Sequence, residues 1–175
     1  MTLDTLNTLG HEEAVAALLR CCGSITWAEQ MAGSRPFSGF EALLARADEL
    51  WGELSRTDCL EAFAAHPKIG DVHQLKEKFA STADWSSGEQ SGVNHADEQV
   101  LERLALGNQR YEQTFGYRFI VCATGKSAAE MVALLEARLG HAPGDEWAVA
   151  CDEQAKIMKL RLEKLVAPPT SSDAK

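Results

Sequence analysis

His66 is the residue of this sequence best suited to acid–base chemistry. It stands in the run His66-Pro67-Lys68-Ile69-Gly70-Asp71, directly after a segment with helical spacing. Because proline disfavours helical geometry in the residue before it, the helix is predicted to stop there and to hold the imidazole at a chain corner. Imidazole gains and loses a proton near neutral pH, so His66 is a candidate proton donor. A favourable contact with the helix dipole is the alternative role.

A polar loop follows at Trp85-Ser86-Ser87-Gly88-Glu89-Gln90-Ser91-Gly92. Its hydroxyl, carboxylate and amide groups suit a small, polar, nitrogen-rich ligand, since a few converging polar groups fix the orientation of a bound molecule. The spacing of Ser86 and Glu89 also fits a capping box that opens a helix, which is the structural alternative. No clean apolar stripe follows this loop, and this favours the ligand site.

Arg161 is a third candidate, on the flank of the apolar stripe of the last predicted helix. Most arginines in such a place extend along the helix to solvent. An arginine that faces a cavity instead binds a carboxylate with its planar guanidinium. The sequence alone is compatible with Arg161 facing either solvent or a cavity.

The segment Tyr117-Arg118-Phe119-Ile120-Val121-Cys122-Ala123 is β-branched and aromatic, and nothing else in the chain resembles a strand that pairs with it. If it is extended among helices, its backbone N–H and C=O groups lack ladder partners, and buried unpaired amides are costly. A polar ligand would satisfy them. A short buried turn of helix is the alternative, because short apolar runs are ambiguous.

Helical periodicity dominates the rest of the sequence. The helices that it predicts must therefore hold the candidate residues in place. Helices are predicted to begin near His11, Ser38, Thr57, Asn94, Ser127 and Ala148 and to end near Gly23, Leu54, His66, Gly116, Gly140 and Leu165. Ser38 with Glu41 and Ser127 with Glu130 have capping-box spacing. The stripe expected to face the core in the last helix consists of Ala148, Cys151, Ala155, Met158, Leu162 and Leu165. The patterns predict an all-α, single-domain helical bundle over residues 1–166 with one short extended segment at about 117–123, followed by a disordered tail at 167–175.

Composition and charge restrict the partners. Of 175 residues, 45% are hydrophobic and 25% are charged, as in an ordinary globular protein. The net charge of −9, without a basic cluster, argues against binding to nucleic acid. The longest apolar runs, such as residues 119–123, fall far short of the ~20 residues that span a bilayer, and the N-terminus lacks a signal-peptide pattern. We therefore expect a cytosolic protein that binds neither nucleic acid nor membranes.

Five cysteines occur without CxxC spacing, largely within apolar helical patterns. An odd number in a cytosolic chain predicts buried thiols without disulfides and without a zinc site. The other histidines, His11, His73, His95 and His141, lie near a helix start or in polar stretches that are expected to be solvated.

These motifs together resemble the OHCU decarboxylases, which act on 2-oxo-4-hydroxy-4-carboxy-5-ureidoimidazoline on the way from urate to (S)-allantoin. The resemblance rests on an ordered set that runs across most of the chain: His66-Pro67-x-Ile69-Gly70, Ser86-x-x-Glu89-Gln90, Phe115-Gly116-x-x-Phe119-Ile120-Val121 and Lys156-Ile157-x-x-Leu160-Arg161-Leu162. Trp27 and Arg35-Pro36-Phe37 also match the N-terminal signature of the family. Each motif is weak alone, but their order makes the set specific.

The resemblance implies a carboxy-lyase with an all-helical fold, a small-molecule ureidoimidazoline substrate, no metal or organic cofactor, and a homodimeric assembly. It makes His66 the catalytic proton donor beside Glu89, with Arg161 completing the catalytic set. The residues that it assigns to substrate binding are Pro67, Ser86, Ser87, Gly88, Glu89, Gln90, Phe119, Ile120, Val121, Cys122 and Ala123. The chemistry agrees, because the substrate's own C=N bond accepts the electrons released with carbon dioxide, and one-sided proton delivery suits a positioned histidine with a carboxylate.

Two other functions stay open on the residues. A metal-dependent all-helical hydrolase would use His66, Asp71 and His73, although the chain has no H-E-x-x-H motif and the ligand spacing is poor. An acidic, non-enzymatic interaction module would use the polar loop merely to cap a helix. Such a module predicts no thermal stabilisation by a nitrogenous ligand, whereas the decarboxylase predicts it.

Overall fold

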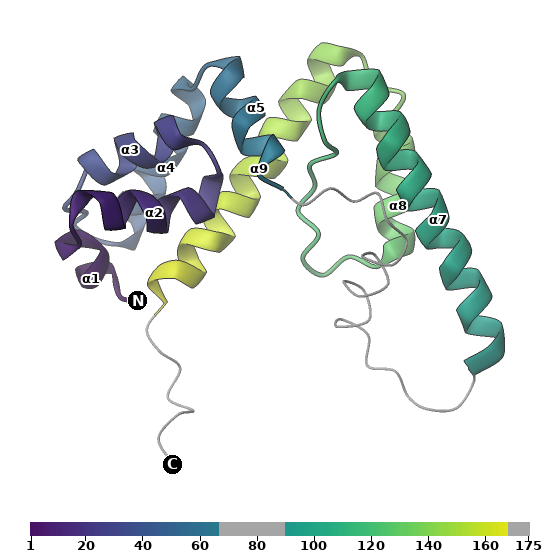
Figure 1. Cartoon of the computed structure of the whole chain (residues 1–175), viewed down its shortest axis with the longest axis horizontal. Coiled ribbons are helices and arrows are strands. Elements are labelled where there is room, and N and C mark those ends of the chain that lie inside the picture. Colours follow the sequence, from purple (N-terminus) through teal and green to yellow (C-terminus); the bar gives the residue numbers. More distant parts are fainter. Residues whose placement is uncertain (67–89, 168–175) are drawn as a thin grey trace. The chain divides into compact units, whose positions relative to one another are not determined.

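Helices make up all the regular secondary structure in the part of the chain that the structure describes. The structure is a computed structural model that describes residues 1–66 and 90–167, with the backbone alone for residues 90–98. Its helices are α1 (Leu3–Thr8), α2 (His11–Cys22), α3 (Ile25–Gly33), α4 (Phe40–Glu53), α5 (Arg56–Ala64), α7 (Gln90–Phe115), α8 (Ala128–Arg138) and α9 (Pro143–Val166) (Figure 1). These described residues contain no strand, and the predicted all-α fold is confirmed.

The contacts within the chain define two compact units. The first consists of Met1–His66 and Cys151–Lys175, and the second consists of Pro67–Ala150. Helix α9 therefore contributes its first turns to the second unit and its remaining turns to the first. The single domain predicted for residues 1–166 stays a prediction, and the predicted tail lies outside the described residues from position 168 onward.

The first unit is built around the helix predicted at His11. Helix α2 ends at Cys22, and Gly23 caps it with the positive φ of 86° that glycine adopts without strain. Helix α3 packs against α2 and also contacts α4 (Figure 1). The fully buried Trp27 of α3 donates from its indole Nε1 to the carbonyl of Ala47 in α4 at 3.1 Å. Burial of this large side chain, with its polar atom satisfied, stabilises the packing of α3 on α4.

Gly23→Ala is expected to lower the free energy of unfolding by about 2 kcal/mol or more, because a positive φ costs an L-residue ~1–2 kcal/mol. In addition, a Cβ at this position would lie 2.5 Å from the Cβ of Ala65. Equilibrium unfolding in urea measures the change. Gly52→Ala in α4 is the matched control, since a Cβ there meets no atom within 4 Å. Alanine favours the helix by ~0.8–1 kcal/mol, so the control should gain stability, and equal losses in both variants would contradict the steric argument.

Two helices of the first unit, α1 and α3, are absent from the sequence prediction. They are short, and Arg35 connects them: its Nη1 donates to the carbonyls of Leu6 and Leu9 at 2.7 and 2.8 Å, and its Nε donates to Ala32 at 2.9 Å. One guanidinium thereby satisfies carbonyls at the ends of both helices. The residues that match the family's N-terminal signature, Trp27 and Arg35, thus have clear structural roles in this unit.

The capping predictions have mixed outcomes. The box of Ser127 and Glu130 is confirmed: Glu130 accepts from the Ser127 N–H at 2.8 Å, and these hydrogen bonds lower the pKa of its carboxyl. The box predicted at Ser38 is wrong, because α4 begins one residue later, at Phe40, with Gly39 as its N-cap and no side-chain cap. Ser55 instead forms an unpredicted box at the start of α5.

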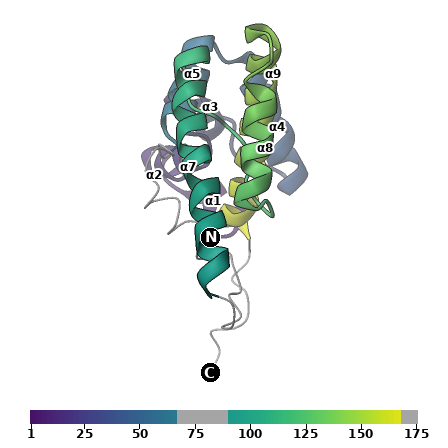
Figure 2. The same cartoon turned by 90° about the vertical axis from the view of Figure 1, so that its right-hand side faces the viewer.

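In the second unit, α7 and α8 lie side by side (Figures 1 and 2). Gly107 of α7 permits this close approach, since a Cβ there would lie 2.5 Å from Cδ2 of Leu135 in α8. At the exposed edge, Nη2 of Arg103 lies 2.6 and 2.8 Å from the two carboxylate oxygens of Glu136. Gly116 ends α7 with a φ of 80°, as predicted from its position.

The buried line of α9 differs from the predicted stripe. Met158 and Leu162 are fully buried as expected, but Ala148 is exposed and the other stripe residues are only half-buried. The residues that are buried recur every fourth position, namely Glu146, Ala150, Gln154, Met158, Leu162 and Val166. The sequence interpretation missed this line because it includes two polar residues, which a search for apolar spacing assigns to solvent.

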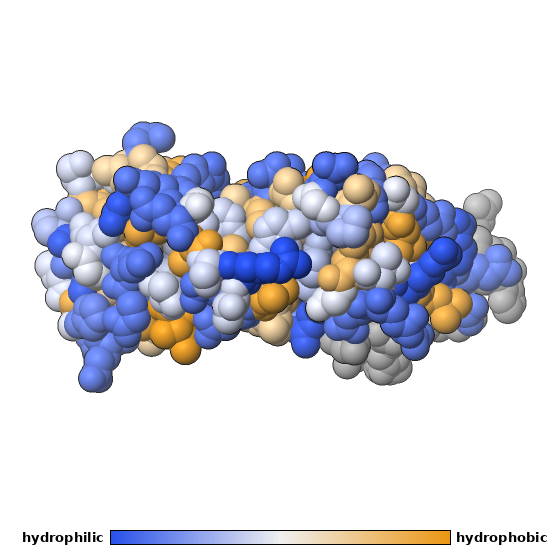
Figure 3. All heavy atoms as spheres, turned by 90° about the horizontal axis from the view of Figure 1, so that it is seen from above, coloured by the Kyte–Doolittle hydropathy of each residue, from blue (hydrophilic) through white to orange (hydrophobic). Residues whose placement is uncertain are grey.

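The face shown in Figure 3 is largely hydrophilic, with small hydrophobic areas scattered among polar residues. Scattered apolar residues of this kind are normal on protein surfaces. Among the described residues, no helix has the length and hydrophobicity needed to cross a membrane.

Candidate active site

His66 lies directly after the C-terminal end of α5, where the sequence predicts it. The helix ends at Ala64 with Ala65 as its C-cap, and the backbone N–H of His66 donates to the carbonyl of Phe63 at 3.2 Å. The ring is half-buried, and its Nε2 lies 2.5 Å from Oε1 of Gln154 in α9. The imidazole is therefore held by a chain corner and by a side-chain hydrogen bond.

Gln154 is a residue that the sequence interpretation missed. Its side chain is fully buried, and its Nε2 donates to the carbonyl of Cys22 at 3.0 Å. Cys22 is the last residue of α2, and the final carbonyls of a helix have no partner within it. The one local signal for Gln154 is its spacing of four residues from the buried Ala150 and Met158. Its amide thus satisfies a helix end while it contacts the candidate histidine.

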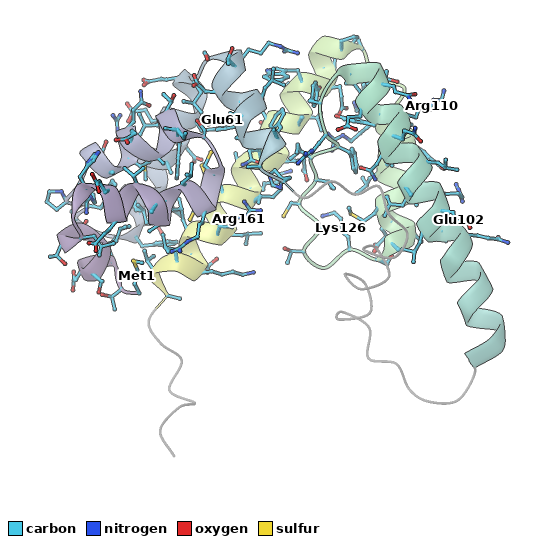
Figure 4. All side chains as sticks on the ribbon, in the orientation of Figure 1. Met1, Glu61, Glu102, Arg110, Lys126 and Arg161 are labelled. Carbon is cyan, nitrogen blue, oxygen red and sulfur yellow. The ribbon has the colours of Figure 1, made fainter. Side chains whose placement is uncertain are left out.

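Arg161 also contacts the end of α2. Its Nη1 donates to the carbonyl of Cys21 at 3.3 Å, and Figure 4 shows the side chain extending from α9 toward α2. The residue is half-buried rather than extended to solvent. Gln154 and Arg161 stand about two helical turns apart on α9, so they share one side of the helix. In the first unit, two side chains of α9 therefore donate hydrogen bonds to two consecutive carbonyls at the end of α2.

The thiols in this region are neutral. Burial raises the pKa of Cys21 to about 11 and that of Cys22 to about 12. A thiol with such a pKa is a poor nucleophile near neutral pH, because the thiolate is the reactive form. The five cysteines of the chain all lie in the described residues and form no disulfide, and Cys21, Cys22 and Cys59 are buried. The prediction of buried, unbridged thiols is confirmed for these three, whereas Cys122 and Cys151 are half-buried.

The segment after Gly116 belongs to the second unit and is neither helix nor strand from residue 118 to residue 123. This confirms a short non-helical segment and excludes the buried helical turn. Tyr117, Phe119 and Ile120 are buried, whereas Val121 to Ala123 are partly exposed. The Phe119 ring packs edge-on against Tyr111 of α7, with 5.1 Å between the ring centroids. The aromatic residues anchor the segment, and its partly exposed end is the part that is accessible to a ligand.

Several carbonyls of this segment have partners within the chain, contrary to the expectation of unpaired groups. Arg138 of α8 donates to Ile120 O at 2.8 Å. Lys126, labelled in Figure 4, donates from Nζ to Cys122 O at 2.7 Å and from its backbone N–H to Ala123 O at 3.1 Å. Local turn geometry and two long cationic side chains satisfy these oxygens. A ligand of the segment would therefore not use these three oxygens as its acceptors.

A buried charged cluster contacts the segment through Arg138, which donates to Ile120 O and lies over the Phe119 ring. The carboxylate of Glu146 in α9 is fully buried and accepts from Tyr111 Oη, from Nε of Arg138 at 2.8 Å and from Nδ1 of His141 at 2.8 Å. Arg138 is itself only 5% exposed and lies 4.6 Å above the Phe119 ring centroid. Burial and the hydrogen bond to the carboxylate raise the pKa of Tyr111, so the phenol stays protonated as a donor.

His141 is exposed, as expected of a residue in a solvated stretch, but it also has a partner in this cluster that the sequence did not indicate. Its side chain is 38% exposed but is fixed to a carboxylate that is fully buried. Glu146 lies in the first turn of α9, where a negative charge also interacts favourably with the helix dipole. Sequence reasoning missed the cluster because its members come from α7, α8, α9 and the loop between the last two helices.

The remaining predicted site residues lie outside the described residues: Pro67, Ser86, Ser87, Gly88 and Glu89, together with Asp71 and His73 of the alternative metal site. Gln90 opens α7, and only its backbone is described. Of the predicted residues that are described, His66 and Arg161 belong to the first unit, and residues 119–123 belong to the second. The assignment of these residues to one active site therefore stays a prediction.

Comparisons with known proteins show which family the chain is similar to. A family model described as OHCU decarboxylase matches residues 7–163. The chain is 37% identical over 147 residues to the uric acid degradation bifunctional protein TTL of Arabidopsis thaliana, covering 83% of this chain and 45% of that protein. It is 28% identical over 163 residues to the 2-oxo-4-hydroxy-4-carboxy-5-ureidoimidazoline decarboxylase of Haloferax volcanii, covering 93% of this chain and 94% of that protein.

A solved structure agrees with these sequence matches. The crystal structure of OHCU decarboxylase in the presence of (S)-allantoin superposes with a TM-score of 0.71 at 33% identity, covering 91% of this chain and 100% of that chain. The present chain thus spans less than half of the bifunctional plant protein but nearly all of the archaeal one. On the match across residues 7–163, the chain belongs to the OHCU decarboxylase family.

Proposed function

We propose that this chain decarboxylates 2-oxo-4-hydroxy-4-carboxy-5-ureidoimidazoline to (S)-allantoin in urate degradation, as a carboxy-lyase. The observation that carries the proposal is the match to the Haloferax volcanii decarboxylase along 94% of that protein's length. That relative is named for this single activity, whereas the plant relative is named as bifunctional. Nearly the full length of a relative that is named for the decarboxylase activity thus aligns with this chain.

The reaction can proceed with side chains alone. The substrate carries a carboxylate and a hydroxyl on one ring carbon, beside a C=N bond. When the bond to the carboxylate breaks, its electron pair forms a C=C bond, and the π pair of C=N moves to nitrogen, which takes a proton. The resulting ene-ol then accepts a proton at the adjacent carbon while its hydroxyl loses a proton to water, so that the C–OH becomes the C=O of allantoin. Delivery of that proton to one face decides the configuration, and this is the task of a positioned general acid.

The roles follow from the residue types. His66, held at the end of α5, delivers the proton, and Glu89 favours its protonated form. Arg161 binds the carboxylate or the charge that develops as carbon dioxide leaves. The loop at Ser86–Gln90 and the segment Phe119–Ala123 bind the heterocycle and the ureido group, the segment through backbone N–H groups. The half-buried positions of His66 and Arg161 support these roles, since each side chain is held in place and still accessible.

The optical activity of the product tests the proposal. Urate oxidase and hydroxyisourate hydrolase generate the unstable substrate, and circular dichroism follows the allantoin that forms from it. Spontaneous decay gives the racemate, so an optically active product in the presence of this protein supports the function. Racemic product formed at the uncatalysed rate would contradict it.

Arg161→Met is expected to lower turnover by about 10²-fold, the usual loss when one charge-stabilising donor is removed. Its effect on folding should be small, because the hydrogen bond to Cys21 O is long at 3.3 Å. Steady-state kinetics and the thermal midpoint separate the two effects. Arg161→Lys should rescue only part of the activity, since lysine keeps the charge without the planar fork. Full activity in Arg161→Met with a lowered midpoint would instead make the residue a packing group.

A further inference from the structure

The orientation of the Gln154 amide is determined by its partners. The carbonyl of Cys22 can only accept a hydrogen bond, so the atom of Gln154 that faces it at 3.0 Å must be the amide nitrogen. The amide oxygen then necessarily faces His66, and it has no hydrogen to donate. Since this oxygen lies 2.5 Å from Nε2 of His66, that ring nitrogen must carry a hydrogen. The end of α2 thus decides which nitrogen of His66 is protonated in the neutral ring.

We propose that Gln154 is a positioning residue that keeps a hydrogen on Nε2 of His66 and thereby assigns proton transfer to Nδ1. The ring gains and loses its second proton at Nδ1 alone, while Nε2–H stays bonded to Gln154 in both states. The assignment of a hydrogen to Nε2 stands on geometry. Its consequence for catalysis rests on the proposed decarboxylation, in which the Nδ1 proton moves to the ring carbon and water restores it afterwards.

The surroundings of Gln154 make it a fixed and neutral partner. The side chain is fully buried, so water does not compete for its hydrogen bonds. The Cys22 thiol that it also contacts stays uncharged, because burial raises the pKa of that thiol to about 12. Arg161 fixes the preceding carbonyl at the same helix end, and Gly23 terminates the helix there. The amide therefore orients the imidazole without a charge that would bind the imidazolium too tightly to release its proton.

Nitrogen NMR of protein labelled at histidine tests the assignment without substrate. The resonances of His66 are identified by their absence in His66→Asn. In the wild-type protein we expect only the Nδ1 signal to move strongly through the titration, with Nε2 remaining in the range of a protonated nitrogen. A neutral form with hydrogen on Nδ1, or a titrating Nε2, would overturn the proposal.

Gln154→Met then tests the consequence for catalysis. This variant removes the acceptor at similar size, so both neutral tautomers should become detectable. We expect kcat to fall about 10²-fold, the effect of a misplaced catalytic group, with KM nearly unchanged. Met158→Leu, on the same fully buried line, is the matched control and should keep both the tautomer and kcat. Unchanged kcat in a folded Gln154→Met protein would contradict the positioning role.

The two proposals fail separately. If the protein gives only racemic allantoin while Nε2 carries the hydrogen, the decarboxylase function is wrong and the role of Gln154 in orienting His66 stands. If stereospecific turnover is present and Nδ1 carries the hydrogen, the function stands and the assignment of proton transfer to Nδ1 is wrong.

Discussion

His66→Asn is expected to lower stereospecific allantoin formation by about 10²–10⁴-fold, the range typical of a lost general acid or base. Asparagine is a neutral polar residue whose amide lies where Nδ1 of the imidazole lies, but it cannot deliver a proton near neutral pH. The fold should therefore survive while proton delivery is lost. Initial rates from the circular dichroism of the product measure the effect.

His11→Asn provides the matched control for this variant. His11 is exposed and pairs with Glu29 on the surface at 2.6 Å, so its replacement should leave the rate unchanged. Glu89→Gln should cause a loss of the same order as His66→Asn. The double variant should be far less impaired than the product of the two losses, since groups that act as a unit are non-additive. Near-normal turnover in His66→Asn would contradict the hypothesis that His66 and Glu89 act as one acid–base unit. Losses in the two single variants that simply multiply in the double variant would contradict it as well.

Glu146→Gln is expected to lower the free energy of unfolding by about 3–5 kcal/mol, because it leaves the charge of Arg138 buried without its counter-ion. Arg138 is 5% exposed, and its Nε lies 2.8 Å from the carboxylate. Glutamine preserves the volume, so loss of charge and of an acceptor accounts for the effect. Urea unfolding followed by far-ultraviolet circular dichroism measures it.

The same substitution at an exposed ion pair is the control. Glu136 pairs with Arg103 in the same unit, but both side chains are about half exposed. Glu136→Gln should therefore cost less than about 1 kcal/mol. Adding Arg138→Met to Glu146→Gln should restore part of the stability, because no uncompensated charge then remains. Equal losses at the two sites would show that burial of the cluster has little energetic consequence.

Local patterns in the sequence predict most of the helices. Helix α2 and its end follow from a clear apolar face and from Gly23, and α8 follows from the capping box at Ser127. Both signals are local: the residues that make each helix also define its limits. Pro67 likewise predicts the position of His66 at the end of α5.

The partners of the site residues are not local, and for this reason the sequence does not reveal them. Gln154 bonds to Cys22, 132 residues away, and Tyr111 bonds to Glu146, 35 residues away. A polar residue on a buried helix face resembles a solvated one until its partner is known. Arg161 illustrates the same limit, since its spacing permits either a surface or a buried contact, and only the structure shows the one to Cys21 O.

The division of the first unit between two distant stretches of the chain affects its synthesis. Helices α1 to α5 leave the ribosome first, but the part of α9 that packs with them is made only after Pro67–Ala150. Trp51 and the carbonyl of Cys22 both await hydrogen bonds with partners that lie at least 100 residues later in the sequence. At ~5–20 residues per second, the intervening stretch takes several seconds to translate. During that time, the apolar faces of the early helices lack their partner, and they are natural binding sites for chaperones that recognise exposed hydrophobic segments.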